Sequence, residues 1–279
     1  MIRRLAACCA ALVVGGLLGA CASAPPLDAG EQARLAALLP ADVLLLGEQH
    51  DAPAHQRLQR QTVEWLAARG QLAALTLEMA ERGHDTRDLP RSASAAQVQQ
   101  ALAWHDAGWP WANYGPVVMA AVRAGVPVLG ANLPATRQRE AMRDTTLDAR
   151  LPPPALKEQQ QRIRDGHCGL LPESQIAPMT RVQIAHDIAM ADTVSAARQP
   201  GRTVLLVAGN GHVQRTLGVP LHLPVGVSSK VVSAQSTASQ PSPVEQTSGA
   251  DLLWPTPPVP PRDYCAELRR MTPAVKPAQ

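Results

Sequence analysis

Short, mostly apolar runs recur along the chain, and each stops abruptly at a glycine or a polar residue. Val43–Leu46 ends at Gly47, Leu72–Leu77 ends at Glu78, and Thr203–Ala208 ends at a second glycine. Short apolar runs between turn signals are typical of strands that are buried on both faces. The pattern therefore predicts a central, largely parallel sheet.

Amphipathic helical patterns separate these runs. Leu58, Thr62, Trp65 and Leu66 fall on one face of a helix. A wider apolar face over residues 174–198 predicts a longer helix. Strands that alternate with helices predict an α/β fold, with the sheet flanked by helices in a single domain.

The beginning of the chain has the features of a secretion signal. Arg3 and Arg4 precede an apolar stretch, Leu5–Leu18, that is too short to span a membrane comfortably. The Leu-Gly-Ala-Cys sequence that ends at Cys21 resembles the lipobox of bacterial lipoproteins. An ordinary signal peptide or a short anchor helix would be the alternatives.

Processing at this motif would remove residues 1–20 as a lipoprotein signal peptide and attach a lipid to Cys21. Ala22 follows the cysteine, and this resembles the sequence of lipoproteins that are sorted to the outer membrane. We therefore expect a lipid anchor at the periplasmic face of that membrane. Loss of two arginines and no acid lowers the formal net charge from +3 to +1. A nearly neutral protein has no electrostatic reason to bind nucleic acid. We expect a tether at 21–30 and a Pro-rich, extended tail at 236–279.

Lipidation of Cys21 would leave Cys168 and Cys265 as the two thiols of the mature chain. Because the periplasm is oxidising, we expect a disulfide between them that pins the tail to the domain. The alternative is that one of them is a metal ligand, as His167 beside Cys168 suggests.

Four polar side chains follow the predicted strand ends: Glu48, His50, Glu78 and His212. A Gly-x-x-His sequence occurs twice among them, at 47–50 and 209–212. Because the carboxyl ends of parallel strands share one edge, we expect these side chains to converge in one cleft, with the two glutamates on neighbouring strands. Carboxylates beside imidazoles can orient them, exchange a proton or share a cation. The alternative is that both histidines begin unrelated polar loops.

Other polar residues nearby have both structural and functional interpretations. Asp51 precedes Pro53 and would either cap the helix that starts there or take part in the site. His55 is expected at the surface. His186 and Asp187 lie in the middle of the long helix, where they would face either the cleft or the solvent.

Aromatic residues are rare but clustered. The chain has five Trp, two Tyr and no Phe, and four of these rings fall in one short segment: Trp104, Trp109, Trp111 and Tyr114. Flat rings close together suit a flat apolar ligand, and a tyrosine phenolate is a known ligand of haem iron. The alternative is a hydrophobic cluster beneath a loop.

Five segments resemble the ChaN-like haem-binding lipoprotein family: LLLGEQHDAPAHQRLQ, LEM at 77–79, WHDAGWPWANYGP, QIAHDIAMADT and LLVAGNGHVQRTLGVPLHL. The resemblance covers about residues 40–235, nearly all of the domain expected at 31–235. It implies an α/β fold, an association with bacterial iron uptake, and a haem pocket that a homodimer could complete.

By this resemblance, the haem-binding residues would be Glu48, His50, Glu78, Trp109, Tyr114 and His212. Tyr114 or a strand-end histidine would ligate the haem iron, while Trp109 and Trp111 would line the macrocycle. Where the family has Arg-Asp in the long helix, this chain has His186-Asp187. That departure leaves the charge of the pocket open.

The family is similar in its core to the erythromycin esterases and the Tiki/TraB proteases, which use such Glu and His residues for hydrolysis. The alternative function is therefore a hydrolase. In that case His50 and His212 would hold a divalent metal or act as general base, and Glu48 and Glu78 would orient water.

Overall fold

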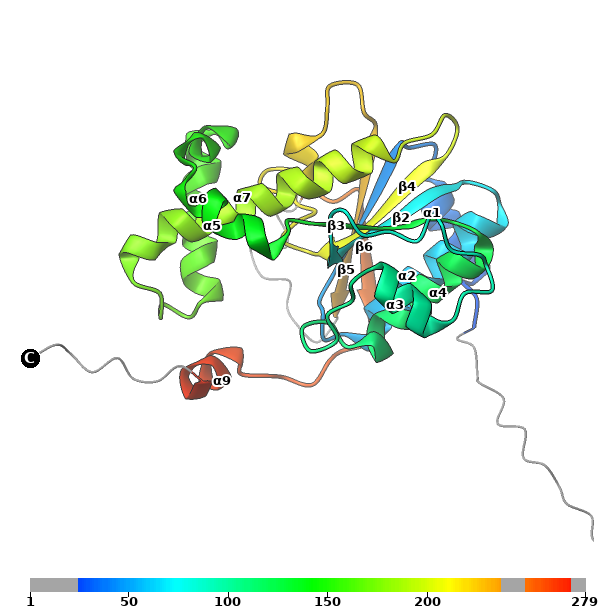
Figure 1. The fold of residues 1–279 in the computed structure, drawn as a ribbon, viewed down its shortest axis with the longest axis horizontal. Coiled ribbons are helices and arrows are strands. Elements are labelled where there is room, and N and C mark those ends of the chain that lie inside the picture. The colour runs from blue at the N-terminus through cyan, green and yellow to red at the C-terminus, as the bar shows by residue number, and fades with distance from the viewer. Residues whose placement is uncertain (1–24, 237–248, 272–279) are drawn as a thin grey trace, which may run out of the picture.

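One parallel sheet forms the centre of the molecule (Figure 1). The computed structural model describes residues 25–236 and 249–271. Within them the sheet has six strands in the order β3-β2-β4-β1-β5-β6. The strands are β1 (Val43–Glu48), β2 (Leu72–Glu81), β3 (Val128–Asn132), β4 (Thr203–Gly209), β5 (Ser229–Ser236) and β6 (Leu252–Thr256). The predicted α/β fold is thus confirmed.

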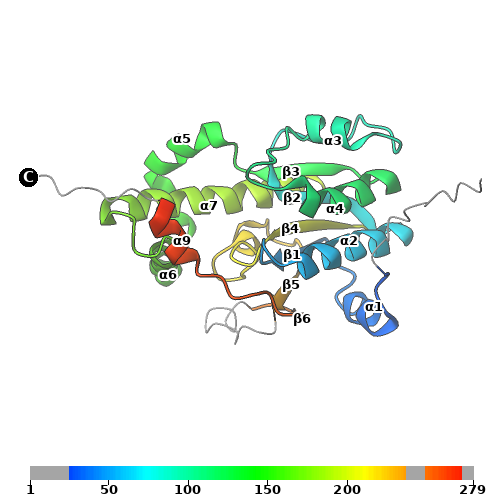
Figure 2. The same ribbon diagram turned by 90° about the horizontal axis from the view of Figure 1, so that it is seen from below.

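Helices cover both faces of the sheet (Figures 1 and 2). One face carries α1 (Ala29–Ala36), α2 (Pro53–Ala68) and α4 (Trp111–Ala124), with α3 (Ala95–Ala101) beside them. The other face carries α7 (Glu173–Ala196) and the short turn η3 (Val219–His222). The remaining helical segments are η1 (Ala135–Arg137), α5 (Gln138–Arg143), η2 (Thr145–Arg150), α6 (Pro153–Gly166) and α9 (Tyr264–Met271).

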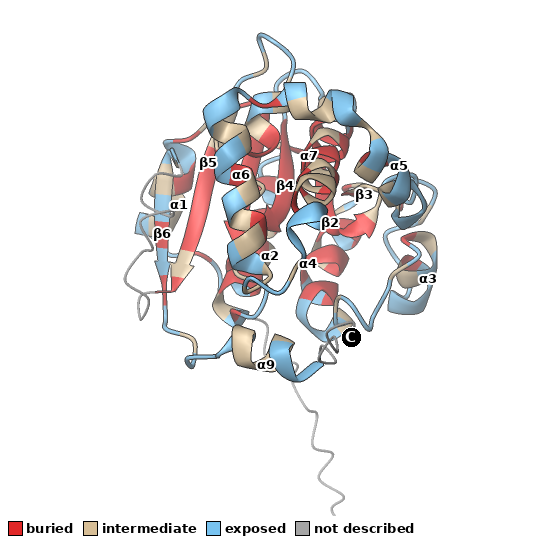
Figure 3. Ribbon diagram, turned by 90° about the vertical axis from the view of Figure 1, so that its left-hand side faces the viewer, coloured by how far each residue is buried: buried red, intermediate tan, exposed pale blue. Residues whose placement is uncertain are grey.

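The uninterrupted apolar runs are explained by this three-layer arrangement. In β1, Leu44 and Leu46 pack into the core under α2 and α4, whereas Val43 and Leu45 pack into the core under α7. Successive side chains of a strand point to opposite faces, so a strand covered on both sides must be apolar at every position. Figure 3 shows the strands buried and the outward sides of the surrounding helices exposed.

The strand order corrects one prediction. Glu48 and Glu78 do not end neighbouring strands, because β4 lies between β1 and β2 and pairs with both. The run at 203–208 is apolar on both faces and can therefore occupy the middle of the sheet. The apolar pattern contains no information on which strand takes that position.

Two strands near the end of the chain were not predicted. β5 lies at the end of the expected domain, β6 lies in the segment after residue 236 whose polar composition predicted an extended tail, and both extend the sheet beyond β1. Pro255 lies within β6, and proline is tolerated there because β6 is an edge strand with one unpaired side. This proline and the polar residues of β5 conceal both strands in the sequence.

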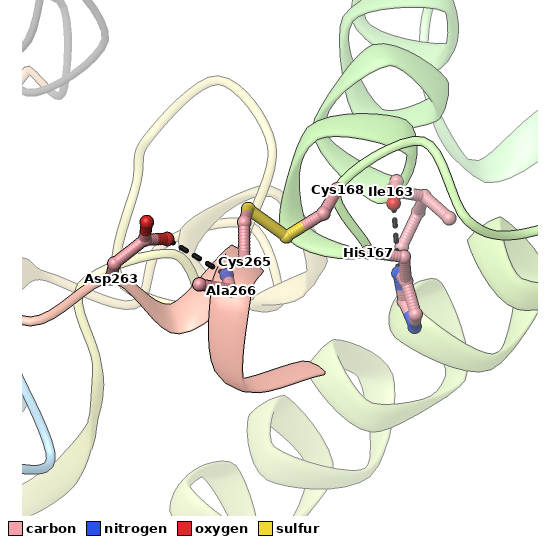
Figure 4. The surroundings of a disulfide bond; sticks show 6 residues. All are labelled: Ile163, His167, Cys168, Asp263, Cys265 and Ala266. Carbon is pink, nitrogen blue, oxygen red and sulfur yellow. Dashed lines mark hydrogen bonds between the residues drawn. A yellow bond between two sulfur atoms is a disulfide. The ribbon is translucent and has the colours of Figure 1, made fainter. Parts of the chain in front are cut away.

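A disulfide joins Cys168 to Cys265, as predicted (Figure 4). The sulfur atoms are 1.98 Å apart and the Cα atoms 5.5 Å apart. Asp263 accepts a hydrogen bond of 2.8 Å from the backbone N–H of Ala266, which fixes the start of α9. The disulfide ties α9 to the turn between α6 and α7, so neither cysteine is free to ligate a metal.

None of the helices in the described ranges is long and apolar enough to cross a membrane. The expected signal peptide and lipidated Cys21 lie outside the residues that the structure describes.

We predict that Cys168 and Cys265 are unreactive in an unreduced, denatured sample and become reactive after reduction. Their sequence separation is 97 residues. For so long a loop, chain entropy sets an upper estimate of roughly 4–5 kcal/mol for the stability lost in Cys168→Ser. Thiol titration and denaturant unfolding measure both effects. Two reactive thiols before reduction would exclude the disulfide.

Candidate functional site

The polar residues of the site come from the carboxyl edge of the sheet and from the helix that crosses it. Glu48 is the last residue of β1, Asn132 the last of β3 and Gly209 the last of β4. Glu78 lies within β2, where the register to β3 shifts between residues 77 and 81. Such irregularities re-aim a side chain locally. Across this edge, α7 contributes its polar side, with residues Gln183, His186 and Asp187.

Three carboxylates and two imidazoles alternate through the cleft. His50 Nδ1 lies 2.8 Å from Glu48 Oε1, and His50 Nε2 lies 4.0 Å from Glu78 Oε1. The same Glu78 oxygen is 3.5 Å from His212 Nε2, and His212 Nδ1 is 2.6 Å from Asp187 Oδ1. The structure thus brings the four predicted residues together and adds Asp187 as the last member of the row.

Glu48 is held in place by three uncharged donors. The Tyr114 hydroxyl donates to its Oε1 at 2.6 Å, and the Gln56 and Gln59 amides donate to its Oε2 at 3.0 and 2.5 Å. The carboxylate is buried, with 2% of the residue exposed. Sequence reasoning missed both glutamines, although their spacing of three residues places them on one face of α2.

Glu78 depends on the backbone of β4. Its Oε2 accepts a hydrogen bond of 2.7 Å from the Gly209 N–H. A Cβ atom at that glycine would lie 3.0 Å from His50 Nε2, so any other residue there would press on the imidazole and the ring would have to shift by a few tenths of an ångström. Burial opposes the charged carboxylate, but His212, His50 and the Gly209 N–H outweigh it and lower the pKa of Glu78 to about 2.

The pKa values of the two histidines of the row are both raised. Burial works against the imidazolium of His212, but Glu78 and Asp187 raise its pKa well above 6.5. The pKa of His50 is also raised, because its hydrogen bond to Glu48 and the charge of Glu78 exceed the cost of its partial burial. Burial raises the pKa of Asp187 to about 6, even though His212 favours the carboxylate.

His186 differs from the other two imidazoles. Its Nδ1 contacts Asn132 Oδ1, and its ring centroid is 6.4 Å from that of His212. Burial and the nearby positive His212 lower the pKa of His186 to about 4, which keeps this ring neutral at physiological pH. Both residues of the His186-Asp187 pair therefore face the cleft.

Tyr114 lies deep in the core, with 1% of the residue exposed. Burial, together with Glu48, raises the pKa of its hydroxyl, so the phenol stays protonated and donates to that carboxylate. The assignment of Tyr114 as an iron ligand stays a prediction. It would require the phenol to lose its proton, leave Glu48 and reach the surface, and the geometry favours a role in fixing Glu48.

The clustered tryptophans divide into two groups. Trp109 is half-buried and meets the exposed His50 edge-on, with ring centroids 4.8 Å apart. The Trp104 and Trp111 rings pack edge-on, with centroids 5.0 Å apart, and the Trp111 ring packs against Gly115 within α4. Trp109 is therefore the ring that borders the cleft, while Trp111 packs one layer behind it.

An apolar groove of about 510 Å³ is formed by segments that also carry residues of the site. Its lining includes Leu133, which follows Asn132 in the sequence, and Ala185, which precedes His186. Its apolar lining is completed by Pro134, Leu147, Ile188 and Ala189. Two guanidinium groups border it: Arg82, paired with Asp192 at 3.0 Å, and Arg137, paired with Glu140 at 2.6 Å. Both pairs are exposed to solvent and can exchange partners at little cost.

Comparison with known families identifies the fold. The profile of the family described as haem-binding uptake, Tiki superfamily, ChaN matches residues 34–223. The chain belongs to this ChaN family. The resemblance of its motifs is thus confirmed over about two thirds of the sequence. No curated protein sequence matches the chain.

Solved structures agree with the ChaN fold. ChaN of Campylobacter jejuni, described with cofacial haem binding, is 23% identical, with a TM-score of 0.61 over 73% of this chain and 85% of that one. The type III effector HopBA1 is 15% identical, with a TM-score of 0.45 over 78% of this chain and 88% of its own. This second likeness is too weak to support an argument.

Two residues of this ChaN-family chain differ from their predicted roles. Asp51 does not cap α2, whose N-cap is Ala52 without a side-chain bond; Asp51 instead accepts a hydrogen bond from Tyr264. His55 is buried rather than exposed: its Nδ1 accepts the Gln49 N–H at 2.9 Å, and its Nε2 meets the side chain of β6 residue Thr256. The sequence concealed this because it did not reveal β6.

The described residues contain no group of three or more His, Cys, Asp or Glu side chains arranged to hold a metal ion. The row of carboxylates and imidazoles instead pairs opposite charges.

We predict that Glu78→Gln lowers the pKa values of both His50 and His212, because the variant removes the carboxylate that both imidazoles face. Proton NMR titration of the histidine ring signals measures the change. Glu64→Gln is the matched control, since Glu64 pairs with Arg60 on the exposed side of α2. Unchanged pKa values in Glu78→Gln would contradict the shared ion pair.

Proposed function

We propose that this protein binds haem at the carboxyl edge of its sheet. Membership of a haem-binding family supports the proposal, as does the fold shared with ChaN of Campylobacter jejuni. Haem is large, flat and apolar, and it carries two propionate carboxylates. A site for it needs an apolar surface, cationic or hydrogen-bonding groups for the propionates, and a ligand for the iron.

The apolar groove carries the proposal. Its aliphatic lining matches the macrocycle, and Arg82 and Arg137 are suited to meet the propionates, because guanidinium groups bind carboxylates through paired hydrogen bonds. His186 follows Ala185 of the lining in the sequence. The apolar lining and the two guanidinium groups therefore suit haem, which when bound would supply an iron centre.

We further propose that the protein is a lipoprotein held by Cys21 at the periplasmic face of the outer membrane, where it takes part in haem and iron acquisition. The Leu-Gly-Ala-Cys sequence and the following Ala22 support this location. The homodimer implied by the family resemblance belongs to the same proposal. Measuring the mass in solution with and without haem tests it.

We expect ferric haem added to the mature chain, with Cys21 replaced by Ser, to give a shifted Soret band that saturates with added haem. Arg137→Ala should weaken binding because it removes a cation from the groove. Arg162→Ala is the matched control: Arg162 forms a similar helix pair with Glu158 on α6, outside the groove. An unshifted Soret band at micromolar protein would refute haem binding.

We expect full-length protein made in a Gram-negative host to sediment with outer membranes, and Cys21→Ser to move it to the periplasmic or unprocessed fraction. Metabolic labelling with a fatty acid checks the same residue directly. Cys265→Ser is the control for a cysteine substitution elsewhere in the chain, and its label should persist. Label that persists in Cys21→Ser would place the lipid on another residue, and unlabelled unaltered protein would refute the lipid anchor.

A hydrolase is the second candidate, favoured by one observation. The buried Asp187 lies 2.6 Å from His212, which resembles the carboxylate that orients a catalytic imidazole. Ester or peptide hydrolysis by haem-free protein that disappears in His212→Ala would favour this candidate.

A further inference from the structure

The segment that follows β6 joins two distant parts of the molecule. It runs from the edge strand of the sheet to α9, and the disulfide between Cys168 and Cys265 fastens α9 to the turn between α6 and α7 (Figures 2 and 4). We call residues 257–271 the C-terminal strap. Because the family profile ends at residue 223, the strap lies outside the segment that the profile matches.

The strap contacts the rim of the cleft. The Tyr264 hydroxyl donates a hydrogen bond to Asp51 in the loop after β1. A cavity of about 290 Å³ lies between the strap and this loop, which lines it with Gln49 and Asp51. His50 stands between these two residues in the loop, and 42% of its side chain is exposed. The strap is therefore attached at the rim where solvent reaches the row of carboxylates and imidazoles.

The disulfide attaches the other end of the strap to the opposite wall of the cleft. That wall is α7, which contributes Gln183, His186 and Asp187. Ten residues separate Glu173, the first residue of α7, from Gln183, so the helix extends past the site by about 15 Å. The turn with Cys168 precedes this extension, and α9 lies beside it (Figure 1). The strap thus links the sheet edge to α7 across the solvent side of the cleft.

Apart from the disulfide, α9 is weakly attached. None of its residues is buried, and a helix of eight residues has little stability of its own. The pair of Arg262 and Glu267, at 2.6 Å, is exposed, and exposed pairs contribute little because water competes for both groups. The covalent bond therefore determines whether α9 stays on the domain.

The segment between β6 and α9 is stiff. Four of the five residues at 257–261 are prolines, and Pro-rich chains stay extended, at about 3.1 Å per residue. The Val259 N–H donates to Ser236 Oγ at 2.9 Å, which fixes the base of the strap at the end of β5. Once released, the strap would swing from this base as an extended arm.

We propose that the strap is a redox-controlled gate. The disulfide holds it across the solvent side of the cleft, and reduction of this bond by a dithiol opens the cleft to a bulky ligand. The control of haem entry rests on the proposed function, whereas the movement of the strap does not.

The redox step is thiol–disulfide exchange. Cys168 and Cys265 are both partly exposed, so a dithiol can reach the bond. One thiolate of the dithiol attacks one sulfur of the disulfide and forms a mixed disulfide, and its second thiol then displaces the protein sulfur. The protein gains two thiols, and the dithiol leaves as a disulfide.

The movement is tested without a ligand, on the mature chain with Cys21 replaced by Ser. We expect dithiothreitol to reduce the disulfide in native buffer. Amide hydrogen exchange, followed by mass spectrometry, should then become several-fold faster in residues 262–271 and 49–52 and stay unchanged in β1 and β4. The double variant Cys168→Ser/Cys265→Ser should behave like the reduced protein.

Two further variants make this test specific. Tyr264→Phe keeps the disulfide but removes the hydrogen bond to Asp51, so it should speed exchange at 49–52 even in the oxidised protein. Arg164→Gln is the matched control: it removes the pair with Glu173 beside the same turn and leaves the disulfide intact. Its exchange in the strap and at 49–52 should match that of the unaltered protein.

The gate is tested with ferric haem as the probe. The double serine variant is used, because a thiol reductant would also reduce the iron. We expect haem to enter and to leave this variant several-fold faster, since a gate changes the barrier in both directions. Stopped-flow absorption measures entry, and capture by excess apomyoglobin measures release.

The outcomes separate the two proposals. A disulfide that resists dithiothreitol in the native protein, or equal exchange at 49–52 in both redox states, would overturn the gate. Faster release of haem without faster entry would also overturn it, because the strap would then be a binding contact. Absence of haem binding by the unaltered protein would refute the proposed function, and the exchange measurements would still decide whether the strap opens.

Discussion

The cleft depends on two carboxylates that are buried near the carboxyl edge of the parallel sheet, at the end of β1 and within β2. An ionised side chain removed from water is strongly destabilising unless nearby groups compensate it. Glu48 is compensated by a phenol, two amides and one imidazole, and Glu78 by two imidazoles and a backbone N–H. These partners come from α2, α4, β4 and the loops after β1 and β4. The need to compensate two buried carboxylates therefore fixes the relative positions of most of the elements that form the cleft.

The same demand leaves few groups of the cleft free to bind a ligand. His50, His212 and Tyr114 satisfy the carboxylates, so their presence in the family motifs follows from the stability of the cleft as much as from any function. His186 and Trp109 lie outside the row and are not paired with the buried carboxylates, so they can still interact with a ligand.

The sequence predicted the features of this protein that arise from local patterns. Runs that are apolar at every position indicated strands buried on both faces, and polar residues at their ends indicated the edge where the cleft lies. Gln56 and Gln59 were missed because their function depends on a partner that another strand supplies. The position of β4 and the burial of His55 were missed for the same reason: both result from pairing between distant segments, which periodicity does not record. The disulfide was predictable because oxidation and the number of cysteines constrain it without knowledge of the fold.

The sheet continues past the part of the chain that the family profile matches. β5 and β6 both follow residue 223, and β6 carries a proline at the outer edge. A chain shortened to residue 235 would expose β5 as a long edge strand with unpaired N–H and C=O groups, which is a template for association with other chains. It would also expose His55, whose neutral ring is buried beneath β6 in the complete sheet. β6 therefore protects the edge of β5 from pairing with other chains, and the segment that the family profile matches would lack this protection.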